Sequence, residues 1–420
     1  MAVATGGQVT TIAPSRMRSQ LAGTPGMLRL CLGVSLVAVV VFGLLAGESA
    51  SSRRQSLTSA RQAAAQAVRI QQVDIALVSA DALATNAFLV GGLEPAQQRA
   101  QYETGITAAA TGLADAANHA QPSDVAGLRG ANVALTTYTG LIESARANNR
   151  QLFPVGVAYL KQASALLKSS VLPELEKVST ASEQRVSDAY DAADTARYAF
   201  WISAALVLVV LAVVQFKLSA LTRRTFNIPV LIGTGLVLVA VIYGGLAMAL
   251  ASSTAKSARS GSYADTTALT RARIDAFTAK SAESLTLISR GNGGSFEQQW
   301  KTSFASAQSS LAAVRNATLT DDLSAYATVH SAIRALDDGG DWDGAVAKAT
   351  SFATGSSNQV FGVFADASQQ RLTATATSLD NSLSNATGDL APTRIAIFAL
   401  GLLAVVAIGV GFTRRLREYR

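Results

Sequence analysis

Two apolar segments close together in the chain decide the fold. Residues 199–216 read AFWISAALVLVVLAVVQF, and residues 228–251 read IPVLIGTGLVLVAVIYGGLAMALA. Each has about the 18–20 apolar residues that a helix needs to cross the hydrocarbon of a bilayer. The link between them, residues 217–227, is short and contains one lysine and two arginines. This pattern predicts two transmembrane helices joined by a basic turn.

Two more apolar segments, residues 30–47 and 395–412, lie near the ends of the chain. Arg29 precedes the first and Arg414 follows the last, whereas Arg394 lies at the other boundary of the last segment. Because positive residues concentrate in cytoplasmic segments, both termini and the 217–227 link are expected in the cytoplasm. A cleaved signal peptide ending near Ala50 is an alternative, but the first segment is long for one.

The sequence therefore predicts a multi-pass protein of the plasma membrane. Its expected parts are a cytoplasmic tail at 1–29, a first span at 30–47, an extracytoplasmic helical bundle at 48–198, a second span at 199–216, a cytoplasmic loop at 217–227, a third span at 228–251, a second extracytoplasmic bundle at 252–394, a fourth span at 395–412 and a cytoplasmic tail at 413–420.

The net charge of +7 follows from this topology. Residues 48–197 hold 14 acidic and 13 basic residues, and residues 252–393 hold 13 and 11. Since neither outer segment is basic, nucleic acid is not an expected partner. Membrane lipid is an expected partner, because the apolar segments are predicted to cross a bilayer.

Residues able to carry catalysis are scarce. The one cysteine, Cys31, lies in the first apolar segment, and the two histidines are His119 and His330. We expect a loop position for His119 and a surface or boundary position for His330. No catalytic residue, metal site or cofactor is predicted, and the protein is not expected to be an enzyme.

The two outer segments resemble each other, which indicates an internal duplication. Each begins with a long helical stretch ending in glycines and then restarts with a polar helix, EPAQQ at 94–98 and SFEQQ at 295–299. The glutamines Gln97-Gln98 match Gln298-Gln299 at an offset of 201 residues. Shared order and spacing of this kind predict two copies of one domain.

Apolar residues recur every three or four positions in both copies, as on one face of a helix. Examples are Ile70, Val73 and Leu77 in the first copy and Ile274 and Phe277 in the second. Turn-forming residues divide each copy into four helices, with breaks at 91–95, 119–124 and 148–154 and at 291–295, 317–321 and 337–343.

Helix lengths suggest how the copies associate. The first outer helix has about 43 residues, roughly 65 Å, whereas the second has about 24. Near the membrane each copy thus offers two helices, too few for a core. The predicted fold is an all-α membrane protein with four transmembrane helices and two tandem extracytoplasmic four-helix bundles that form an intramolecular pseudo-dimer, with its long helices continuing directly into the spans.

Large aromatic residues lie near the loops predicted farthest from the membrane: Phe153, Phe296 and Trp342, with Trp300 one turn into the adjoining helix. Such residues anchor protein partners when exposed, and we predict a partner-binding role for them. The alternative is that they close the end of the bundle.

A span, a four-helix bundle and a second span resemble the sensory half of a chemoreceptor or sensor kinase, here in tandem. No HAMP, methylated coiled-coil or kinase region follows Arg223 or Arg414. The overall architecture is similar to the actinobacterial four-span signal-relay family GlnX. That resemblance implies an extracytoplasmic amino-acid-binding lipoprotein and the cytosolic protein kinase G as partners.

In chemoreceptors, arginines on the long helices bind ligand at the interface between two bundles. By that resemblance Arg69, Arg271 and Arg273 are candidate ligand-binding residues, although a solvated face or an interhelical ion pair is the more usual role of arginines on such helices. Arg223, Arg224, Arg414 and Arg415 form a basic inner surface that could contact a cytosolic partner.

The expected function is a transmembrane signal relay. It would receive nutrient status, amino acids above all, from an extracytoplasmic solute-binding lipoprotein and pass it to a cytosolic Ser/Thr kinase or other output protein. Alternatives are a direct small-molecule receptor with its ligand between the bundles, and a scaffold of the cell envelope.

Overall fold

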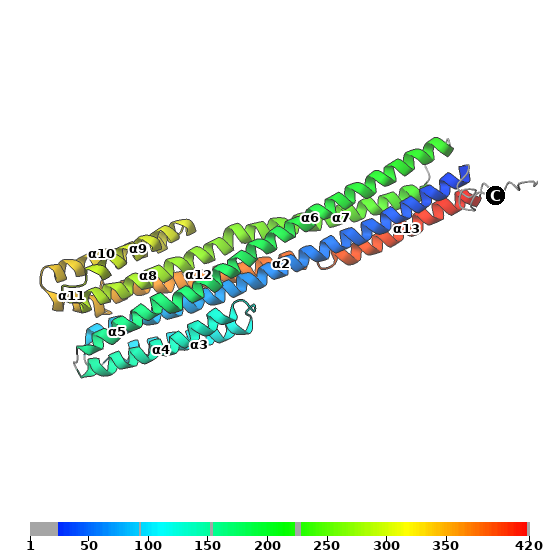
Figure 1. The fold of residues 1–420 in the computed structure, drawn as a ribbon. Helices are drawn as coiled ribbons and strands as arrows, with labels where there is room; N and C mark the ends of the chain where they lie inside the picture. The colour runs from blue at the N-terminus through cyan, green and yellow to red at the C-terminus, as the bar shows by residue number, and fades with distance from the viewer. Residues whose placement is uncertain (1–23, 92–93, 152–153, 223–227, 418–420) are drawn as a thin grey trace, which may run out of the picture. The chain divides into compact units, whose positions relative to one another are not determined.

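The computed structural model describes residues 24–91, 94–151, 154–222 and 228–417. In these ranges the regular structure is entirely helical (Figure 1). The chain forms two compact units. We call residues 58–190 and 254–385 the bundle unit, and the described parts of residues 1–57, 191–253 and 386–420 the apolar unit.

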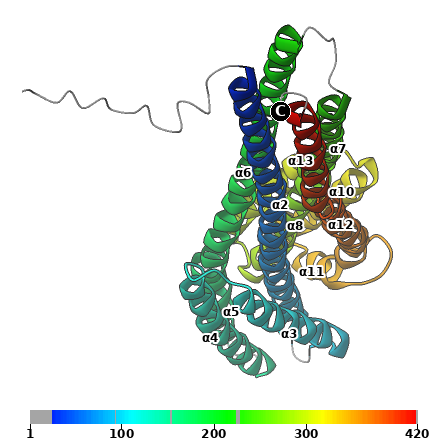
Figure 2. The same ribbon diagram turned by 90° about the vertical axis from the view of Figure 1, so that its right-hand side faces the viewer.

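Four long helices supply the apolar unit (Figure 2): α2 (Thr24–Val90), α6 (Leu172–Thr222), α7 (Ile228–Ala258) and α13 (Thr393–Arg417). By length and composition each of their apolar segments could cross a membrane. Large apolar side chains such as Ile202, Phe216 and Leu402 are exposed. So much exposed apolar surface is unfavourable in water. The four helices are therefore compatible with a multi-pass membrane protein.

Glycines allow α7 to pack closely against its neighbours in the apolar unit. A Cβ at Gly233 would lie 2.5 Å from Cγ1 of Ile408 in α13, and one at Gly244 would lie 2.7 Å from Cζ of Phe200 in α6. Small residues at such positions let helices approach each other in a membrane.

The first half of the bundle unit is built from the C-terminal part of α2, α3 (Ala96–Asn118), α4 (Val125–Arg150) and a continuous run of α5 (Val155–Leu166), the π-helical turn η1 (Leu167–Val171) and the first part of α6. The connections fall at the predicted breaks. Pro173, just after η1, has no N–H for a bond to Ser169, and the wider π turn accommodates this loss. The core contains Ile70, Leu77, Tyr138 and Leu160.

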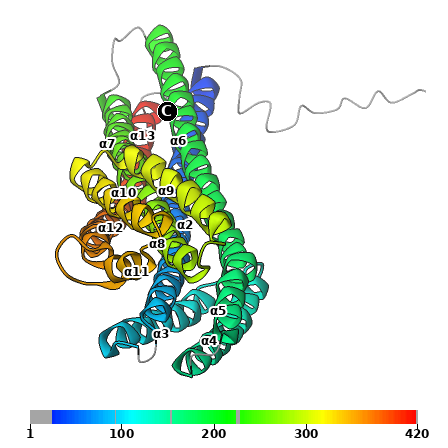
Figure 3. The ribbon, with the colours of Figure 1, turned by 90° about the vertical axis from the view of Figure 1, so that its left-hand side faces the viewer.

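The second half repeats this order (Figure 3), with the end of α7, the π-helical turn η2 (Arg259–Tyr263), α8 (Ala264–Ile288), α9 (Gly294–Val314), α10 (Ala317–Asp338), α11 (Trp342–Thr350) and α12 (Ser357–Gly388). Its core contains Ala276, Trp300, Tyr326 and Phe364. The hairpin of α9 and α10 packs along α8.

The second half differs from the sequence prediction in two turns. The break predicted at 317–321 lies at residues 315–316, because Arg315 has a left-handed φ of +55° and Asn316 accepts a hydrogen bond from the N–H of Leu319. A fifth helix, α11, also follows α10. It starts where the Asp341 side chain accepts a bond from the N–H of Gly344 at 2.9 Å. An extra helix of this kind needs only a local cap.

The expectation that every long helix continues directly into a span was wrong for the last one. Helix α12 ends at Gly388, and α13 begins at Thr393. Pro392 lies between them and cannot donate the backbone hydrogen bond that a continuous helix needs.

Candidate functional site

A buried carboxylate joins the two halves of the bundle unit. Asp81 of α2 accepts hydrogen bonds from Ser164 Oγ at 2.7 Å and from Tyr138 Oη at 3.3 Å in the first half. Its other oxygen accepts a bond from Ser281 of α8 at 2.7 Å. Asp81 is 1% exposed. A buried carboxylate with three donors stabilises the contact that it forms.

An amide cluster forms a second link about one turn further along α2. Asn86 Oδ1 accepts bonds from Gln98 Nε2 at 3.0 Å and from Asn358 Nδ2 at 2.8 Å. Its Nδ2 donates to the carbonyl of Ala349 at 3.1 Å. This one amide thereby connects α2 and α3 to the segment around α11 and α12.

A groove of about 1180 Å³ lies beside this cluster, between α2 and α3 on one side and α8 and α12 on the other. We call it the interbundle groove. Amide side chains line it together with Arg273, Lys280 and Asp366. Phe352 and Val363, 51% and 47% exposed, add an apolar wall. Concave sites with an apolar wall and a few polar groups are where small ligands bind.

A row of five charged side chains runs through the second half, and we call it the charge row. Lys280 Nζ lies 2.7 Å from Glu283 Oε1, and Glu283 Oε2 lies 3.0 Å from His330 Nδ1. His330 Nε2 is 3.2 Å from Glu297 Oε2, which is 3.6 Å from Arg334 Nε. Charges alternate along the row, so each carboxylate lies between cations.

The charge row sets the ionisation of its members. Burial lowers the pKa of His330, but hydrogen bonds to Glu283 and Glu297 outweigh burial, and the pKa is raised. Burial raises the pKa of Glu283, but the charge of Lys280 and the bond to His330 outweigh it and hold the pKa at about 2. Protonated His330 and ionised Glu283 therefore stabilise each other.

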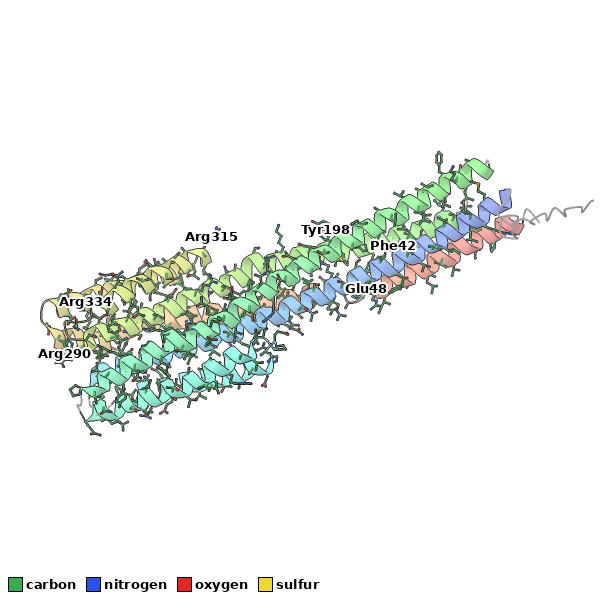
Figure 4. The ribbon with its side chains drawn as sticks, in the orientation of Figure 1. Phe42, Glu48, Tyr198, Arg290, Arg315 and Arg334 are labelled. Atoms are coloured by element: carbon green, nitrogen blue, oxygen red, sulfur yellow. The ribbon has the colours of Figure 1, made fainter. Side chains whose placement is uncertain are left out.

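The charge row ends at a polar pocket of about 800 Å³. This distal pocket lies where α8 turns into α9 and α10 turns into α11, and Figure 4 labels Arg290 and Arg334 there. Arg334 pairs with Asp337 at 2.5 Å. Lys280 lines the interbundle groove and Arg334 lines the distal pocket, so the charge row reaches from one to the other.

The aromatic residues predicted to bind a partner make contacts inside the protein. Trp300 is 7% exposed, stacks on His330 at 3.7 Å between ring centroids, and donates to Tyr326 Oη at 3.1 Å. Trp342 donates to the carbonyl of Leu287 at 3.0 Å, and the Arg290 guanidinium lies 4.0 Å above its ring. These contacts are those expected of side chains that close the end of a bundle.

The other two aromatic candidates give less information. Phe296 is half-buried against the core of the first half, with Lys161 Nζ 5.4 Å from its ring centroid. Phe153 lies outside the described residues. Partner binding by the four aromatics stays a prediction.

The three candidate ligand-binding arginines do not converge. Arg69 pairs with Asp115 at 2.8 Å within the first half. Arg271 is exposed and lies 3.6 Å from Glu183. Arg273 alone lines the interbundle groove, where it is 5% exposed.

Of the four predicted cytoplasmic contact residues, Arg414 is exposed at the end of α13. Arg223 and Arg224 lie outside the described residues, and the side chain of Arg415 is likewise not described. Their role stays a prediction.

Sequence reasoning missed Asp81 and the charge row. The surface or boundary position predicted for His330 was wrong, because its side chain is buried between two carboxylates. A signal was present: Lys280 and Glu283 interrupt the face of α8 that carries Ala276 and Leu287. Charged residues three apart on an apolar helix face suggest a buried pair.

Comparison with known proteins found one match. Residues 56–191, about a third of the chain, match the family model described as Actinobacterial sensor domain. Neither the search of curated proteins nor that of solved structures returned a match. The matched range covers the first half of the bundle unit, including Asp81 and Asn86. The match supports a sensor family in actinobacteria and, with it, a sensing or signalling role.

Proposed function

We propose that the protein is a transmembrane signal relay. Its outer helices receive nutrient status, amino acids above all, from an extracytoplasmic solute-binding lipoprotein, and its inner surface passes the signal to a cytosolic Ser/Thr kinase or other output protein. The observation that carries the proposal is continuity: α2 and α6 run for 67 and 51 residues, each from an apolar segment into the sensor-matched region. A helix without a break can transmit a shift of about 1–2 Å along its length.

The proposed topology places both termini and the 217–227 link in the cytoplasm and both bundles outside. The concentration of basic residues in the tails and the link, with Arg29 and Arg414 beside the first and last apolar segments, supports this orientation. We propose further that the two bundles act as an intramolecular pseudo-dimer. The Asp81–Ser281 contact supports it. A second contact joins Arg61 of α2 to Asp380 of α12: the two carboxylate oxygens of Asp380 lie 2.6 and 2.9 Å from two guanidinium nitrogens of Arg61.

Arg53 is suited to couple the helices of the apolar unit. It is 2% exposed, bonds to the carbonyl of Ala193 in α6, and donates to Ser252 Oγ in α7 at 2.8 Å. Asp194 lies 3.7 Å away. One α2 side chain thereby binds two other helices just beyond the first apolar segment, where a shift of α2 would move them as well.

Crosslinking in living cells, followed by mass spectrometry of the captured proteins, tests the relay. We expect recovery of a solute-binding lipoprotein together with a cytosolic kinase. A photoreactive residue at Val133, which is exposed on α4, and another in the 217–227 link separate the two sides. If neither position captures its expected partner, the relay is contradicted.

The interbundle groove favours a second candidate, a direct small-molecule receptor. In that case ligand in the groove, rather than a docked lipoprotein, would shift the helices. A thermal shift of the purified chain with small ligands, in the absence of any lipoprotein, would distinguish it from the relay.

A further inference from the structure

Arg273 differs from other buried cations of the protein. Arg53, Arg146 and Lys280 each lie within 4.0 Å of a carboxylate. In the described part of the chain, the Arg273 guanidinium has no such partner. It donates to two neutral acceptors, the carbonyl of Ala365 and Ser368 Oγ, and its buried Nε has no partner.

This cation remains charged in the folded protein. Burial lowers the pKa of Arg273, the charge of Asp366 opposes it, and the resulting value of about 10 leaves the side chain protonated at neutral pH. A buried charge with only neutral acceptors is costly, and an anion at hydrogen-bond distance would offset that cost. Planar guanidinium groups bind carboxylates with two parallel hydrogen bonds.

The side chains around Arg273 determine which other chemical groups an anion bound there would need. The ring of Phe277 lies 5.5 Å from its guanidinium, and Phe352 and Val363 expose apolar surface along the same groove. The buried Oε1 of Gln98, also in the groove lining, has no hydrogen-bond partner and, as an acceptor, fits a donor group on the ligand and not its carboxylate. An apolar body beside a carboxylate suits this lining.

We infer that the interbundle groove is a binding site for a small organic carboxylate with an apolar body, held through its carboxylate by Arg273. The inference rests on the proposed sensing function and names the ligand class for the direct-receptor candidate. Asp366, in the same groove, gives two sources of ligand to distinguish: a simple carboxylate, which Asp366 repels, and an amino acid, whose ammonium group it attracts.

Only the second half of the bundle unit supplies an arginine to the groove among the lining residues. At the offset of 201 residues, the counterpart of Arg273 is Gln72, which is neutral. On the opposite side, a smaller pocket of about 390 Å³ contains Arg271, which already pairs with Glu183. One carboxylate per chain is therefore expected.

Saturation-transfer NMR on the full chain in nanodiscs tests the site, with benzoate and L-phenylalanine as probes. Benzamide is the neutral control for benzoate, and nanodiscs without protein give the baseline for lipid binding. We expect transfer to benzoate or to phenylalanine, but none to benzamide. No transfer to either carboxylate would overturn the inference.

Substitutions in and near the groove test whether the carboxylate binds at Arg273. Arg273→Gln should weaken binding about tenfold or more, whereas Arg271→Gln, two residues away and exposed, should leave it unchanged. Equal binding by wild type and Arg273→Gln would overturn the inference. If Arg273→Gln loses its helical circular dichroism, Asp366→Asn replaces it as the test. Removing this exposed carboxylate should tighten benzoate binding or weaken phenylalanine binding by a few fold, and no change in either would reject the site.

The groove and the relay can fail separately. If neither probe binds in the groove but the cytosolic output is intact, this inference is rejected and the proposed relay is unaffected. If a carboxylate binds in the groove but no cytosolic partner or output is found, the relay is rejected and this inference is supported.

Discussion

Ser281 of α8 donates a hydrogen bond to Asp81 of α2 at 2.7 Å, and both side chains are 1% exposed. The two residues belong to different halves of the bundle unit and are 200 positions apart in the chain. Since Asp81 also accepts bonds from Ser164 and Tyr138, its carboxylate holds helices of both halves together.

Asp81→Ala should destabilise the protein by about 3 kcal/mol, because three buried hydroxyl groups lose their acceptor. Ser281→Ala should cost about 1 kcal/mol, since one bond is lost. Because the two residues touch, the double variant should be more stable than the sum of the single effects predicts. Thermal unfolding of the purified chain, followed by circular dichroism, measures all three. Strictly additive effects would contradict the direct contact.

The charge row predicts a pH dependence of stability. The folded pKa of His330 is raised above its unfolded value near 6.5. The histidine therefore contributes stability that is fully present below the unfolded pKa and is lost as pH rises through the folded pKa. Glu283, Glu297, Lys280 and Arg334 are the charged groups of the row around it.

We expect the melting temperature of wild type to fall as the pH rises above the unfolded pKa of histidine, near 6.5, and this slope to be much reduced in His330→Gln. His119→Gln is the matched control, because His119 is exposed just after the end of α3, where its Nδ1 lies 2.9 Å from the Asp115 backbone carbonyl. A His330→Gln slope equal to that of wild type would contradict the assignment.

Close packing of α7 against α13 predicts a difference between two glycines. Gly233→Ala places a methyl group 2.5 Å from Ile408, and overpacking of this kind costs about 1–3 kcal/mol. Gly235→Ala meets nothing within 4 Å and should be neutral. Resistance to unfolding in detergent compares them, and equal stability would show that α7 and α13 are not packed in this way.

The contacts of Arg53 predict a variant in which both stability and signalling are reduced. Arg53→Ala removes the bonds from α2 to α6 and α7 and should cost about 2–4 kcal/mol. It should also reduce the cytosolic response to nutrient more than the exposed neighbour substitution Arg54→Ala does. Full signalling by Arg53→Ala would exclude this junction from the relay.

The sequence predicts the helices well, because apolar periodicity and turn residues act locally. Residues 228–251 lie in α7 as expected, and Gly91 marks the end of α2. Pro392 carried a local signal for the break before α13 that the length argument overlooked. The extra helix α11 depends on the cap formed by Asp341, which is harder to recognise because residues 337–343 contain three other aspartates and two glycines.

The candidate site was less predictable, because the burial of a charge depends on residues distant in the chain. Arg69, Arg271 and Arg273 have similar local sequence settings, yet only Arg273 lines the groove. Asp81 is buried because Ser281 and Ser164 lie opposite it, and periodicity on α2 carries no information about those partners.

The most direct test of the proposed relay is the nutrient-dependent output of the proposed cytosolic kinase in cells that lack this protein. Phosphorylation of the kinase's substrates should lose its response to amino acids in the deletion strain, return with the wild-type chain, and return weakly with Arg53→Ala. An unchanged amino-acid response in the deletion strain would contradict the proposed function.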